Sequence, residues 1–78
     1  MPEIDTRNRL YTVVSKVLNI PVAEVKDDLA VGEVPQWDSL AHVTLISAVE
    51  KEFNIKFEVD QVFEIEEVED FLDILTTN

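Results

Sequence analysis

Apolar residues recur at three- and four-residue spacing in three stretches of this sequence, and that period limits the fold more than any other feature. A period near 3.6 residues is typical of an α-helix with one buried face. A shorter apolar group at residues 59–63 indicates one more short helix. The three long stretches cover residues 4–18, 38–54 and 68–75.

We therefore predict an all-α fold, a small helical bundle of three main helices and one short helix. A chain of 78 residues suffices for one domain, so we assign residues 1–78 to a single unit. Residues 55–58 alternate apolar and polar side chains as a strand does, but no second strand could pair with them. We expect that segment to be an extended link.

A long loop is predicted between the first and second helices, over residues 19–37. Asn19 can take the left-handed conformation that ends a helix, and Pro21 cannot continue one. Within the loop, residues 22–25 could form one helical turn, and Leu29 could anchor the chain to the core. A connection of this length in a compact domain is usually functional.

The second helix should begin at Asp38, because an aspartate side chain can accept a backbone N–H of the first helical turn. Leu40 and Val43 begin an apolar stripe that we expect to face the core, and Leu45 and Ala48 widen it. The stripe continues through Ile46, Val49 and Phe53 and ends near Asn54.

Ser39 would then lie in the first turn of this helix, directly after the loop. With Leu40 and Val43 buried, its hydroxyl should face solvent. Unpaired backbone N–H groups and the helix dipole favour an anion there, such as a phosphate ester. On local grounds alone, a plain helix cap explains Asp38 and Ser39 at least as well.

The formal net charge is −11, and residues 27–78 hold 14 acids against two bases. Nucleic acid is therefore not an expected partner, because its phosphates would be repelled. Proteins with basic patches would instead be attracted to the acidic part of the chain. The acids could also serve only to keep a small domain in solution.

Cysteine is absent, which excludes disulfides, thiolate metal sites and a cysteine nucleophile. His42 is the single histidine, so a multi-histidine metal site is excluded and no metal site is predicted. The N-terminus lacks the features of a signal peptide, and no apolar run is long enough to cross a membrane. We expect a cytoplasmic monomer that does not insert into membranes.

The tripeptide Asp38-Ser39-Leu40 is similar to the Asp-Ser-Leu attachment motif of the acyl carrier proteins. The residues around it strengthen the resemblance, which covers nearly the whole chain. Phe57 and Ile65 stand where apolar residues line the substrate crevice of that family. The pattern of its second helix is reproduced by Val43, Leu45, Ile46, Ala48, Val49, Glu50 and Phe53.

This resemblance implies that a phosphopantetheinyl transferase attaches a 4′-phosphopantetheine arm to Ser39, with Asp38 and Leu40 as the rest of the attachment motif. Asp38 would help to hold magnesium in the encounter complex. The arm would carry acyl intermediates as thioesters to enzymes of lipid, fatty acid, polyketide or related biosynthesis. The chain itself would be no enzyme. Basic patches of the loading and processing enzymes would dock on Glu50, Glu58, Glu64 and Glu67.

The sequence departs from the pattern of fatty-acid carriers on the second helix. Ala41 and Thr44 occupy exposed positions that are commonly acidic there, and Ser47 occupies a place where an apolar contact residue is common. A specialised pathway is therefore at least as well supported as the housekeeping one.

Several alternatives stay open. An aminoacyl or peptidyl carrier would use the same chemistry, and an acidic interaction domain would leave Ser39 unmodified. Ser39 and His42 share a helical face and could mimic a nucleophile and its base, although the remaining hydrolase features are missing. Trp37 could pack against His42 as a staple, which we favour, or could form a wall for the arm.

Overall fold

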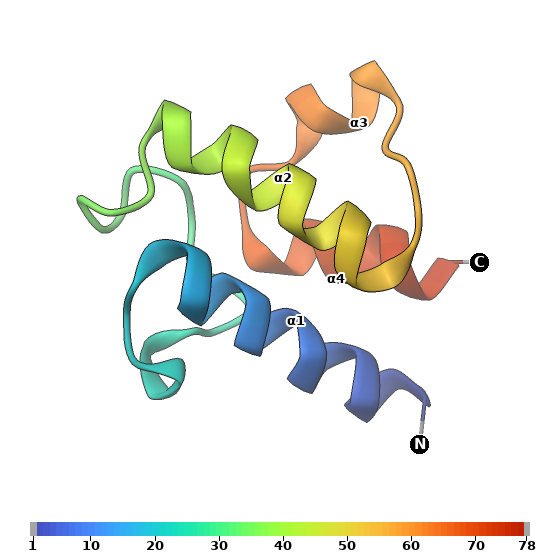
Figure 1. The fold of residues 1–78 in the computed structure, drawn as a ribbon, viewed down its shortest axis with the longest axis horizontal. Coiled ribbons are helices and arrows are strands. Elements are labelled where there is room, and N and C mark those ends of the chain that lie inside the picture. The colour runs from blue at the N-terminus through green and yellow to red at the C-terminus, as the bar shows by residue number, and fades with distance from the viewer. Residues whose placement is uncertain (1, 78) are drawn as a thin grey trace.

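The computed structural model describes residues 2–77, with side chains from residue 4 to residue 76, and within that range it is all-helical (Figure 1). Three main helices, one short helix and a long loop after the first helix confirm the predicted architecture. The described chain contains no helix long and apolar enough to cross a membrane. The elements are α1 (Pro2–Leu18), the 3₁₀ turn η1 (Val22–Glu24), α2 (Ser39–Phe53), α3 (Val59–Glu64) and α4 (Val68–Thr77).

Two asparagines end the first two long helices, as their positions predict. Asn19 has φ of 56°, and the next residue, Ile20, donates its N–H to the carbonyl of Ser15 at 3.1 Å. The same arrangement follows α2, where Asn54 has φ of 54° and precedes Ile55. A left-handed residue followed by this backward hydrogen bond satisfies carbonyls that the last helical turn leaves unpaired.

The core draws on every helix except the short α3 and on the loop between α1 and α2. α1 packs against both α2 and α4. The loop contributes Val25, Leu29 and Trp37, so it is part of the core and not merely a connection. The remaining buried side chains are Leu10, Val14, Leu18, Ile20, Leu45, Ile46, Val49, Ile65, Val68, Phe71 and Leu72.

The predicted buried face of α2 is wrong at its N-terminal end. Leu40 is 77% exposed and Val43 is 64% exposed, whereas Leu45 is fully buried. The helix is apolar at so many positions that two stripes can be drawn along it, and the structure uses the one that starts at His42 and continues through Leu45 and Val49. A histidine at the head of that stripe concealed it from the sequence pattern.

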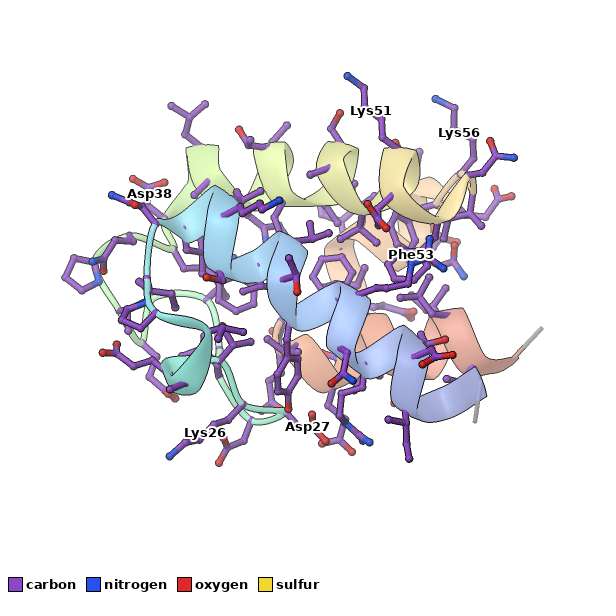
Figure 2. All side chains as sticks on the ribbon, turned by 60° about the horizontal axis from the view of Figure 1, so that its bottom comes forward. Lys26, Asp27, Asp38, Lys51, Phe53 and Lys56 are labelled. Carbon is purple, nitrogen blue, oxygen red and sulfur yellow. The ribbon has the colours of Figure 1, made fainter. Side chains whose placement is uncertain are left out.

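Polar contacts tie the loop to α1 through Asp27, whose carboxylate accepts hydrogen bonds from the Tyr11 hydroxyl and from Arg7 Nη2 at 3.0 Å. These bonds stabilise the charged carboxylate, the one from Tyr11 most strongly, and lower the pKa of Asp27. Burial and the neighbouring Asp27 raise the pKa of Tyr11. The loop is thereby held beneath α1, at the edge where Figure 2 labels Asp27.

Backbone hydrogen bonds tie the same loop to the start of α4. Val31 donates to the carbonyl of Glu66 at 2.8 Å, and Val68 donates to the carbonyl of Leu29 at 3.0 Å. The loop is thus fixed on two sides before the chain reaches α2.

The corrected face of α2 can be tested with two leucines of the same helix. Leu45→Ala should lower the free energy of unfolding by about 2–5 kcal/mol, because it leaves a cavity in the core. Leu40→Ala should change it by no more than about 0.5 kcal/mol, because that side chain is already in water. Urea titrations of both variants would measure this, and equal losses would contradict the assigned face.

Candidate functional site

The start of α2 is capped as the sequence predicts. Asp38 has an extended backbone, and its Oδ1 accepts a hydrogen bond from the N–H of Ala41 at 2.8 Å. Its carbonyl accepts from the N–H of His42 at 2.9 Å. The remaining first-turn N–H groups, those of Ser39 and Leu40, have no partner within the helix. An anion attached at this point would meet two free donors and the positive end of the helix dipole.

All three residues of the Asp-Ser-Leu motif are exposed. Ser39 faces solvent as expected, but not for the expected reason, since Leu40 and Val43 are exposed beside it. Ser39 and Val43 are four residues apart on one helix, so they share a face. An exposed Ser39 therefore already required an exposed Val43, a signal in the sequence that we did not use.

Trp37 anchors the residue before the cap. Its side chain is fully buried, and its Nε1–H donates a hydrogen bond to Nδ1 of His42 at 3.0 Å. The two rings also stack, with centroids 6.0 Å apart. The expected packing of Trp37 on His42 is confirmed, although the sequence did not reveal the hydrogen bond. With none of its surface exposed, Trp37 offers no wall to an arm.

The polar side chains that could have activated Ser39 are used for structure. Nδ1 of His42 accepts from Trp37, and Oδ1 of Asp38 accepts from Ala41. Across residues 4–76 no hydrogen bond joins Ser39 to His42. The spacing that suggested a nucleophile and its base therefore does not produce that pair. Nor do three histidine or acidic side chains of the described chain gather where they could hold a metal ion.

Exposed apolar side chains occur on both helices that follow the loop, a feature that sequence reasoning missed. Leu40 and Val43 lie on α2, next to Ser39, while Val59 and Phe63 lie on α3. Phe63 is 81% exposed, although a large aromatic ring is usually anchored by packing. Exposed apolar groups of this size often mark surfaces that bind other proteins.

The four acids predicted for docking differ in how far they are free. Glu58 and Glu64 are exposed at the two ends of α3. Oε2 of Glu50 instead accepts the N–H of Phe57 at 2.9 Å, so this carboxylate holds the link between α2 and α3. Glu67 is half-buried; its partial burial, and then the neighbouring acids, raise its pKa.

The two residues expected to line a substrate crevice pack against the core. Ile65 is buried, and the ring of Phe57 meets the ring of Phe71 edge-on, with centroids 5.8 Å apart. Phe57 is only half-buried, so it lies between the core and the surface on the side of α2 that Glu50 occupies.

Comparison with known proteins connects this geometry to a family. The chain matches the family described as phosphopantetheine attachment site over residues 8–75. It is 35% identical over 74 residues to an acyl carrier protein of Phaeodactylum tricornutum (strain CCAP 1055/1), and the alignment covers 95% of this chain and 97% of that protein. Such carriers are not catalysts; they work with a transferase and with enzymes that process the cargo. This chain belongs to that family and is a phosphopantetheine-bearing carrier protein.

Proposed function

We propose that Ser39 is the attachment residue and that the chain is an acyl carrier protein. The observation that supports this most is an exposed serine hydroxyl at the first position of α2, beside two unpaired backbone N–H groups. These donors fit the phosphodiester that joins serine to the arm. When attached, the arm supplies a terminal thiol that holds acyl groups as thioesters.

The attachment step needs only a nucleophilic hydroxyl from this chain. Oγ of Ser39 would attack the phosphorus that bears the pantetheine of coenzyme A. A phosphorus–oxygen bond of the diphosphate breaks, adenosine 3′,5′-bisphosphate leaves, and the serine proton passes to a base of the transferase. We propose that Asp38 contributes to the magnesium site of that complex through Oδ2, because Oδ1 already accepts the N–H of Ala41.

Partner enzymes would recognise two different surfaces. From Ser39 to Val49, α2 carries no acid, and Leu40 and Val43 make its exposed end apolar. The exposed acids Glu58 and Glu64 lie on or beside α3. We therefore propose that partners set an apolar surface against α2 and basic side chains against α3.

Of the other acids assigned to docking, Glu50 also holds Phe57 and Glu67 is half-buried, so their part in docking would be smaller. The similarity to an acyl carrier protein supports acyl groups over aminoacyl groups as cargo. A single domain over residues 1–78 that acts as a cytoplasmic monomer completes the proposal. The pathway could be that of fatty acids, polyketides or a related product.

Attachment is tested by mass spectrometry. Incubation with coenzyme A, magnesium and a promiscuous phosphopantetheinyl transferase should add one arm mass to the wild type. Ser39→Ala should gain none, because the acceptor oxygen is gone. Ser47→Ala, which alters another exposed serine of α2, should load like the wild type. An unmodified wild type, under conditions that load a control carrier, would refute the assignment.

Docking is tested by the rate of the same loading reaction. Glu64→Lys should lower kcat/KM by at least about threefold at low salt, because it reverses a charge that attracts the transferase. Glu24→Lys makes the same charge change in η1, away from α3, and should have a smaller effect. The difference between the two variants should shrink as salt screens the charges. Equal effects at every ionic strength would contradict docking through α3.

A further inference from the structure

Half of the six basic side chains of this acidic protein gather around one groove. The groove lies between α1 and α2, encloses about 660 Å³ and is bordered by Arg9, Lys16 and Lys51. Glu52 is the only acid on its border, so the groove has a formal charge of +2 in a chain of −11. A cluster of this sign opposes the field of the rest of the protein and would attract an acidic partner.

Arg9 is committed to the wall of the groove. Its Nε donates to Oε2 of Glu52 at 3.0 Å, its Nη2 donates to the Glu52 carbonyl at 2.7 Å, and its guanidinium lies 4.5 Å from the centre of the Phe53 ring. Together these contacts hold α1 against the end of α2. Arg9 therefore shapes the groove and neutralises its single acid.

Lys16 and Lys51 are free to bind. Both are exposed, and neither has an ion-pair or hydrogen-bond partner among residues 4–76. They rise from opposite walls, Lys16 from α1 and Lys51 from α2, which run antiparallel (Figure 1). Figure 2 shows Lys51 near the end of α2 that lies away from Asp38.

The floor between these lysines is apolar and narrow. Val13 and Val17 come from α1, and Ala48 comes from α2. All three are half-buried, so they form a strip that is still accessible to another chain. An occupant that matches this groove has a strip of apolar side chains with acids on both of its flanks. An amphipathic helix presents that pattern along one side.

We propose that this groove is a docking site for an acidic amphipathic helix of a partner protein. The helix would lay small apolar side chains on Val13, Val17 and Ala48, and would pair its acids with Lys16 and Lys51. A second copy of this chain is a poorer occupant, because two proteins of charge −11 repel each other.

The groove and Ser39 lie on opposite sides of α2. Ser39 and Ala48 are nine residues apart, about two and a half helical turns. The printed contacts agree, since Glu52 faces Arg9 of α1 whereas Glu50 faces Phe57 beyond the other flank. A partner helix in the groove would leave Ser39 accessible. The groove would thus tether the carrier to one protein while another acts on its cargo.

The test uses a fluorescent helical peptide, cross-linked to stay helical, with an alanine and leucine strip flanked by glutamates. Fluorescence anisotropy would measure its Kd for the wild type and for the double variant K16E/K51E. The variant should bind at least about tenfold more weakly, because both pairing cations are reversed. The matched control K26E/K56E has the same net charge but alters lysines outside the groove, and it should bind clearly more tightly than K16E/K51E.

Further arms separate the alternatives. In NMR titrations the peptide should shift amides of residues 8–17 and 48–52, and a peptide with lysine flanks should not. Both double variants should accept the phosphopantetheine arm at similar rates, which shows that they are folded. Equal binding of the peptide to both double variants would overturn the proposal. So would no binding to the wild type, or groove shifts caused by dodecanoate and not by the peptide.

Discussion

The buried indole of Trp37 fixes the functional end of this protein. An indole removes a large apolar surface from water, and its N–H would destabilise the fold if it were buried without an acceptor. Nδ1 of His42 provides that acceptor from the first turns of α2. Trp37 directly precedes the cap residue Asp38, so the core holds the start of α2, and Ser39 stands in solvent one residue further along.

The loop before Trp37 is ordered by contacts that reach both α1 and α4. Val25 and Leu29 are buried, Asp27 accepts hydrogen bonds from α1, and Val31 donates to the backbone before α4. Ordering so long a connection has a large entropic cost, which these contacts offset. The result is a rigid mount for Ser39, whose only mobile part would be the attached arm.

Local chemistry could be predicted from the sequence, and tertiary choice could not. The left-handed asparagine Asn19 and the cap at Asp38 depend on neighbouring residues alone, and both predictions are confirmed. The buried face of α2 depends on which of two apolar stripes meets the other helices. Burying His42 instead of Leu40 is favourable only because Trp37 brings a donor to it. The groove escaped prediction for the same reason, since its walls come from two helices.

Hydrogen exchange at the Trp37 indole tests this anchoring most directly. NMR would follow exchange of the Nε1–H in the native protein and compare its free energy of opening with the free energy of unfolding from urea titration. If Trp37 holds the start of α2, the two should agree, while the unpaired amide of Leu40 exchanges rapidly. An indole N–H that exchanges as fast as an exposed one would contradict a buried anchor beneath Ser39.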